Sequence, residues 1–144
     1  MYKKIFVIIF ILLTSCSQEP KNAVTVQDAW IREAPPNASA MAGYLSITNS
    51  TDQDRILTFA KSKQFNVVEI HRTIVENGVA KMRRQDNLIV PAGDSLVFKP
   101  GDFHLMLMGP QAKLKAGDEV TITLCLLIDD KIEELDVVMP VKKP

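Results

Sequence analysis

The sequence predicts an all-β protein, built as an antiparallel Greek-key sandwich or barrel. Residues of high strand propensity gather in short runs, and several runs alternate apolar and polar side chains with the period of two that a half-buried strand requires. Turn-forming residues separate these runs at short intervals. No helix of useful length is indicated in the folded part, and no internal repeat is visible. Many short strands at such spacing are typical of a sandwich or barrel.

Ten runs are expected to form strands, and residues that interrupt pairing separate many of them. Proline lacks the backbone donor of a strand ladder, whereas glycine and asparagine accept the positive φ of tight turns. Such residues stand at Pro35-Pro36, Asn77-Gly78, Pro91-Ala92-Gly93, Pro100-Gly101 and Ala116-Gly117. In order, the expected strands are residues 24–32, 42–49, 54–62, 66–75, 78–85, 88–90, 95–99, 104–108, 120–128 and 132–141.

The first residues have the features of an export signal. Lys3 and Lys4 precede the apolar run IFVIIFILL, residues 5–13, which is shorter than the roughly 20 residues of a transmembrane helix and has the length of a signal-peptide core. The segment Leu-Thr-Ser-Cys that ends at Cys16 resembles the lipobox of bacterial lipoproteins. We therefore expect residues 1–15 to be a lipoprotein signal peptide and Cys16 to be lipidated. The alternative is an ordinary secretory signal with an incidental cysteine.

Lipidation at Cys16 would hold the protein in the cell envelope, at a membrane facing the periplasm. Residues 16–22 are polar and aperiodic, so they are expected to tether the lipid to the folded part. Ser17 resembles the sorting pattern that directs lipoproteins of some Gram-negative bacteria to the outer membrane. Residues 23–144 are then expected to make a single domain with a sizeable core.

Charge and cysteine content argue against several functions. The chain has 17 basic and 17 acidic side chains, and removal of the signal peptide takes away two lysines and no acid. The remaining chain is slightly acidic and has no basic run, which argues against a nucleic-acid partner. With Cys16 lipidated, Cys125 has no cysteine to pair with, so packing must hold the fold. In the apolar run TITLCLLI, Cys125 is expected to be a small buried side chain.

One predicted hairpin carries a histidine and a methionine. Asn77-Gly78 is a strong signal for a type I′ turn, because both central residues of that turn need positive φ. If these two residues form the loop, Thr73 pairs with Met82 across the hairpin. His71 shares a face with Thr73, so Met82 lies diagonal to His71, within reach of a long side chain.

The strand at residues 104–108 repeats this combination. Successive side chains of a strand point to opposite faces, so His104, Met106 and Met108 share one face, while Leu105 and Leu107 share the other. The leucine face is ordinary core. Each step of two residues advances roughly 7 Å along a strand, which places Met108 well past His104. We therefore expect Met108 to be a wall of the site rather than a ligand.

Two imidazoles and two thioethers make a coherent ligand set for copper. Thioether sulfur is a soft, neutral ligand that favours Cu(I), and imidazole also binds copper. Magnesium and calcium need oxygen ligands, and structural zinc usually takes thiolate or imidazole. The residues therefore predict a Cu(I) site formed by His71, Met82, His104 and Met106.

A structural alternative applies to each of these residue types. Methionine in a strand most often fills gaps in a core, and a lone histidine is usually a satisfied or solvated side chain. Both histidines of this chain, however, have a methionine on the same face or hairpin. Met41 and Met139 have no histidine on the same face or hairpin, so we expect them in the core.

The spacing of the four residues, H-x10-M-x21-H-x-M, resembles the motif of the periplasmic copper chaperone family PCu(A)C. The blocks DAWIREAPP, AGYLSITN, GVAKM, KPGDFHLMLMGP, LKAGDEVTITL and VVMPV also look like that family, so the resemblance covers nearly the whole mature chain. It implies a cupredoxin-like or immunoglobulin-like β-fold, Cu(I) binding, and delivery of copper to the Cu(A) centre of cytochrome c oxidase or to its assembly factors. The ligand roles it implies fall on His71, Met82, His104 and Met106.

Other matches and departures refine what the resemblance implies. Trp30, Arg32 and Asn49 match family positions that are expected to be structural, with Trp30 as a core anchor. Arg72 follows the first histidine, where some members have methionine. The sequence also ends at VKKP, whereas some members carry a tail rich in histidine and methionine. The resemblance therefore does not extend to a second copper site.

Rival functional classes fit the residues less well. A blue-copper electron carrier needs a thiolate close to a histidine, and Cys125 has no histidine after it. With both histidines in the predicted site and no catalytic arrangement evident, no enzymatic activity is expected. Copper storage or tolerance, and a β-sandwich interaction module without metal, remain alternatives. The protein is expected to be a monomer with a lipid anchor.

Overall fold

A computed structural model describes residues 23–143, which fold entirely into strands, turns and loops without a helix. The predicted signal peptide (residues 1–15), the tether (residues 16–22) and Cys16 lie outside the described residues. A strand forms at each of the ten predicted runs, with ends shifted by at most a few residues. The strands are β1 (Val24–Arg32), β2 (Ala40–Asn49), β3 (Arg55–Lys61), β4 (Phe65–Glu76), β5 (Val79–Gln85), β6 (Leu88–Val90), β7 (Ser95–Phe98), β8 (Phe103–Pro110), β9 (Glu119–Ile128) and β10 (Lys131–Lys142).

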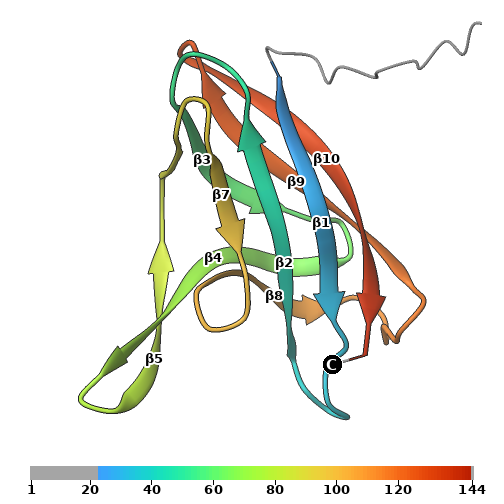
Figure 1. The fold of residues 1–144 in the computed structure, drawn as a ribbon. Helices are drawn as coiled ribbons and strands as arrows, with labels where there is room; N and C mark the ends of the chain where they lie inside the picture. Colours follow the sequence, from blue (N-terminus) through green and yellow to red (C-terminus); the bar gives the residue numbers. More distant parts are fainter. Residues whose placement is uncertain (1–22, 144) are drawn as a thin grey trace, which may run out of the picture.

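The strands form a β-sandwich, as predicted, with two layers that share one continuous path of pairing (Figure 1). The first layer has the order β5-β4-β8-β2-β1, with β7 also pairing with β2. The second layer has the order β10-β9-β3-β6. A short parallel pair, Ile31 with Val141 and Arg32 with Lys142, joins β1 to β10, while the other strand pairs are antiparallel. The first layer carries both histidines, on its neighbouring strands β4 and β8.

The core lies between the two layers and is almost entirely aliphatic. Ile31 and Leu105 of the first layer and Leu124 of the second are fully buried. Met41 and Met139 also lie in this core, which confirms the prediction for both. Because alternate residues of a strand face opposite ways, the side chains between these core positions in the first layer point to its outer face.

Cys125 is buried and unpaired among the described residues, as expected. Burial raises the pKa of the Cys125 thiol above its ordinary value. A thiol reacts as its thiolate, so a raised pKa makes Cys125 less reactive at neutral pH. The side chain therefore serves packing.

Trp30 does not anchor the core, and that prediction is wrong. Its neighbour Ile31 fills the core, so Trp30 points to the outer face of the first layer. There Trp30 is half-buried against Tyr44, its partner across β1 and β2, with ring centroids 4.8 Å apart.

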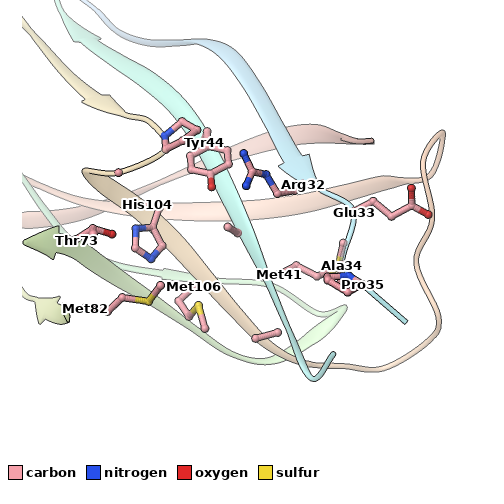
Figure 2. A pocket seen from close by; sticks show the side chains of 14 residues that line it. Arg32, Glu33, Ala34, Pro35, Met41, Tyr44, Thr73, Met82, His104 and Met106 are labelled. Carbon is pink, nitrogen blue, oxygen red and sulfur yellow. The ribbon is translucent and has the colours of Figure 1, made fainter. Parts of the chain in front are cut away.

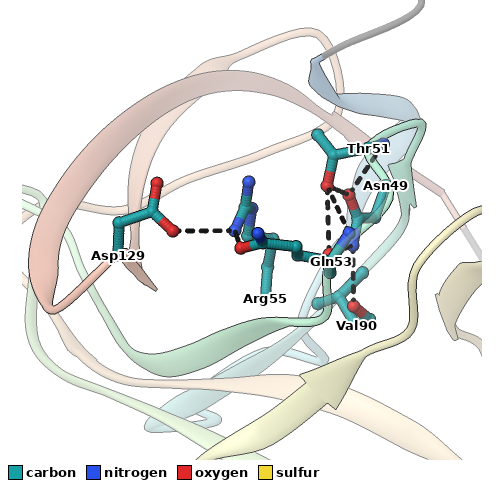
Figure 3. A network of polar contacts seen from close by, with 6 residues as sticks. All are labelled: Asn49, Thr51, Gln53, Arg55, Val90 and Asp129. Atoms are coloured by element: carbon teal, nitrogen blue, oxygen red, sulfur yellow. Dashed lines mark hydrogen bonds and ion pairs between the residues drawn. The ribbon is translucent and has the colours of Figure 1, made fainter.

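Asn49 has the structural role that the resemblance implied. Its side chain is fully buried and donates hydrogen bonds to the backbone carbonyls of Gln53, at 2.8 Å, and Val90, at 3.0 Å. Its amide oxygen accepts from the backbone N–H and the hydroxyl of Thr51, at 3.1 and 2.7 Å (Figure 3). These bonds tie the loop after β2 to the end of β6. The adjoining Arg55 pairs with Asp129 at 3.6 Å.

Within residues 23–143 no helix is long and apolar enough to cross a membrane.

Candidate metal centre

The hairpin of β4 and β5 brings Met82 next to the strand of His71. Asn77 and Gly78 form its turn with φ of 53° and 78°, the positive values that a type I′ turn needs. Thr73 pairs with Met82, so the predicted register is confirmed. The hairpin projects beyond the body of the sandwich (Figure 1), and Met82 is 60% exposed.

Strand β8 lies on the other side of β4 and sets the two histidines opposite one another. His71 and His104 are direct partners in the antiparallel register, and their ring centroids are 5.9 Å apart with an angle of 61° between the planes. A metal held about 2.0 Å from one nitrogen of each ring lies roughly 3 Å from each centroid. The separation of the rings thus suits two imidazoles that share one ion.

Both candidate methionine ligands lie on the same outer face as the histidines. Met106 follows His104 by two residues on β8 and pairs with Glu69 of β4 on one side and Ala42 of β2 on the other. Met108 shares this face but pairs with Val67, one more step away from the histidines. Its position agrees with the expectation that Met108 lies past the site.

A pocket of about 400 Å³ opens beside these residues. Met82, His104 and Met106 line it together with Arg32 and Tyr44, and Figure 2 shows their side chains around one hollow. His104 is only 4% exposed, so the pocket reaches the edge of a nearly buried ring. His71 does not line this pocket. Its side chain, 16% exposed, lies against the ring of His104.

Hydrogen bonds leave one nitrogen of each ring available. Nδ1 of His104 lies 3.0 Å from the backbone carbonyl oxygen of Asp102, which can only accept, so Nδ1 donates and Nε2 keeps its lone pair. Nε2 of His71 lies 2.8 Å from a carboxylate oxygen of Glu69, so this nitrogen donates. Nδ1 of His71 is buried and has no hydrogen-bond partner. A buried polar atom without a partner is costly unless something binds it.

The donor set fits a soft metal better than a hard one. In the described part of the chain, no group of three or more His, Cys, Asp and Glu side chains is arranged to hold a metal ion. Methionine sulfur would therefore have to complete any coordination sphere around His71 and His104. Two imidazoles with thioethers suit Cu(I) rather than calcium, magnesium or structural zinc.

The structure adds residues to which the sequence reasoning gave no role at the site; among them, Arg32 was expected to be structural only. Glu69 contacts His71 and also accepts a hydrogen bond at 2.9 Å from Arg84, the partner of His71 on β5. Arg32 and Tyr44 line the pocket on the far side from the hairpin, with the Arg32 guanidinium 5.8 Å from the Tyr44 ring centre. The period of two could have placed Glu69 on the face of His71, but its contact with Arg84 needed the strand pairing.

Comparison with known proteins identifies a family for almost the whole described region. Residues 24–141 match the family described as "Putative lipoprotein LpqE-like". A 104-residue segment is 32% identical to "Putative lipoprotein Lxx21020" of Leifsonia xyli and covers 72% of this chain. A 98-residue segment is 36% identical to "Uncharacterized protein RP573" of Rickettsia prowazekii and covers 67% of this chain. These matches span only 61% and 53% of the two relatives.

Solved structures share the fold over most of their length. The apo form of DR1885 from Deinococcus radiodurans is 30% identical, with a TM-score of 0.62 over 100% of this chain and 97% of that one. Its Cu(I) form is 27% identical, with a TM-score of 0.64 over 90% and 83%. The copper-bound PCuAC domain of PmoF2 is 21% identical, with a TM-score of 0.68 over 84% and 93%, and it supports the fold alone. The chain belongs to the LpqE-like family, and its structural resemblance to PCuAC domains is confirmed.

Proposed function

We propose that the protein binds one Cu(I) ion through His71, Met82, His104 and Met106. The observation that carries the proposal is the pairing of His71 with His104 on adjacent strands, with ring centroids 5.9 Å apart and one available nitrogen on each ring. Met106 on the same strand as His104, and Met82 on the neighbouring hairpin, offer sulfur to the same face. The solved relatives that contain copper add support.

The proposed role is that of a copper chaperone rather than an enzyme. All four ligands are neutral, so none holds the ion by opposite charge, and Met82 is exposed where another protein can reach it. A thiolate of an acceptor could replace the thioethers and then the imidazoles through shared coordination. Such exchange needs no redox change of the carrier.

The proposed location is the cell envelope. A signal peptide over residues 1–15 and a lipid on Cys16 would hold residues 23–144 at a membrane, facing the periplasm, and the outer membrane if the cell is Gram-negative. The lipoprotein descriptions of the family and of one relative support this location. There the protein would supply copper to the Cu(A) domain of cytochrome c oxidase or to its assembly factors.

The direct test of copper binding is a titration with Cu(I) under anaerobic conditions in competition with a chromogenic chelator. One tightly bound equivalent per chain is expected. No binding would contradict the proposal and favour the interaction module without metal. Several equivalents per chain would favour copper storage or tolerance.

Membrane attachment is tested separately in cells. Wild-type protein should fractionate with membranes and carry lipid on Cys16, whereas Cys16→Ala should remain unprocessed or be released. Cys125→Ala is the matched control, because it removes the other cysteine and should not alter fractionation. A soluble wild-type protein without lipid would contradict the proposed anchor.

A further inference from the structure

We propose that Glu69 is a positioning residue for His71: its carboxylate fixes the protonated nitrogen of the ring and so reserves Nδ1 for the metal. This inference rests on the proposed Cu(I) site and adds to it a residue outside the ligand motif. Nε2 of His71 lies 2.8 Å from one oxygen of Glu69, and only a protonated nitrogen can donate to a carboxylate. The other ring nitrogen, Nδ1, is buried without a partner.

Glu69 is itself held on its second oxygen. Arg84 donates to that oxygen at 2.9 Å, and Arg84 pairs with His71 across β4 and β5. The Glu69 side chain is 21% exposed, so water competes little for its oxygens. The chain Arg84–Glu69–His71 thus runs over one face of two adjacent strands, and both carboxylate oxygens have a donor.

The two histidines therefore differ in the nitrogen that they offer. His104 donates from Nδ1 to a backbone carbonyl and offers Nε2, while His71 donates from Nε2 to a carboxylate and offers Nδ1. A carboxylate acceptor makes the opposite nitrogen of an imidazole a stronger donor to a metal and fixes the ring orientation. His71 would then be the better electron donor of the pair, although its ring does not line the pocket.

Asp102, just before β8, provides a matched control. Asp102 precedes His104 by two residues, as Glu69 precedes His71, and its carboxylate also pairs with an arginine, Arg72, at 2.9 Å. The contact from Asp102 to His104 comes from the backbone carbonyl instead. Asp102→Asn consequently removes a comparable charge but keeps the backbone carbonyl that accepts from the His104 ring.

The inference is tested with ¹⁵N NMR of the imidazoles and with Cu(I) competition. In the metal-free wild type at slightly alkaline pH, His71 should be protonated at Nε2, and in the Cu(I) form its Nδ1 signal should shift. Glu69→Gln keeps the size of the side chain but leaves one carbonyl oxygen to accept from both His71 and Arg84. The fraction of His71 rings protonated at Nε2 should therefore fall. Its Cu(I) affinity should fall about 10- to 100-fold, the usual effect of losing such a partner.

The controls separate positioning from folding and from copper binding as such. Asp102→Asn should keep the wild-type affinity and the wild-type His71 signals, and Arg84→Gln should give a smaller loss than Glu69→Gln. The inference fails if wild-type His71 is protonated at Nδ1, or if Glu69→Gln binds copper as tightly as Asp102→Asn. If the wild type itself binds no Cu(I), the proposed function fails, and the metal-free NMR signals still decide whether Glu69 sets the protonated nitrogen.

Discussion

His71 and His104 face each other as register partners on β4 and β8, although 32 residues of chain separate them. The hydrogen bonds of the two strands fix the spacing of the rings, at 5.9 Å between centroids, so neither histidine depends on a mobile loop for its place. A rigid pair loses little conformational freedom when it takes up a metal, which favours binding.

This pair leads to the first prediction, on Cu(I) affinity. His71→Ala or His104→Ala should each weaken Cu(I) binding by more than about 100-fold. Losing a residue that only hydrogen-bonds to a ligand costs up to about 100-fold, and losing the ligand itself should cost more. Met108→Leu should leave the affinity unchanged, because Met108 lies one step farther along the strand and does not line the pocket. Chelator competition measures all three variants. Equal losses for Met108→Leu and the histidine variants would contradict the assigned site.

Local sequence signals predicted the strands and one register well. Asn77-Gly78 determines its own turn, and the turn then sets the pairing of Thr73 with Met82, so all the information lies within a few residues. The pairing of β4 with β8 has no such local signal, because it joins segments far apart in the sequence. The grouping of His71 with His104 therefore depended on ligand chemistry and on the resemblance to a known motif.

Residue type misled the prediction for Trp30, and alternation could have corrected it. A large aromatic residue suggests a core, but Ile31 next to it occupies the core side, and neighbours on a strand face opposite ways. Glu69 was missed for a different reason. Arg84 holds its second carboxylate oxygen, and that contact follows only from the side-chain arrangement across two paired strands.

The second prediction concerns stability at Asn49. Asn49→Ala should lower the free energy of unfolding by about 3 kcal/mol, because the buried Val90 carbonyl and the Gln53 carbonyl lose their donor and Thr51 loses its acceptor. Urea denaturation measures the change. Asp129→Asn is the control from the same region, since Asp129 is 74% exposed and its pair with Arg55 is long. That control should cost about 0.5 kcal/mol or less.

The third prediction concerns alkaline pH and Cys125. Burial raises the pKa of this thiol in the folded state, so above the unfolded thiol pKa of about 8.5 the unfolded chain releases the proton first. The buried Cys125 thiol therefore contributes its full stability below that pH, and this contribution is lost as the pH rises above it. Wild type should therefore lose stability faster than Cys125→Ala in urea denaturations from neutral to alkaline pH. Parallel losses would mean that the folded thiol titrates normally.

The fourth prediction concerns the hand-over of copper, for which Met82 is the first point of contact. Met82 is 60% exposed on a projecting hairpin, while His104 is nearly buried, so an incoming thiolate meets the Met82 sulfur before the imidazoles. Transfer from the Cu(I)-loaded protein to a soluble Cu(A) domain should therefore proceed at a rate proportional to the concentration of that domain. A small chelator at the same free-copper level should remove the ion more slowly.

Variants separate this mechanism from simple release. Met82→Leu should change the free energy of unfolding by no more than about 0.5 kcal/mol, as expected of an exposed side chain, while it weakens Cu(I) binding and raises spontaneous loss of the ion. Cys125→Ala should transfer copper at the wild-type rate, because that thiol is buried on β9, in the other layer, and does not line the pocket. A rate that does not depend on acceptor concentration would instead mean that copper dissociates before capture. The protein would then act as a copper store, since a chaperone must pass the ion on by direct contact.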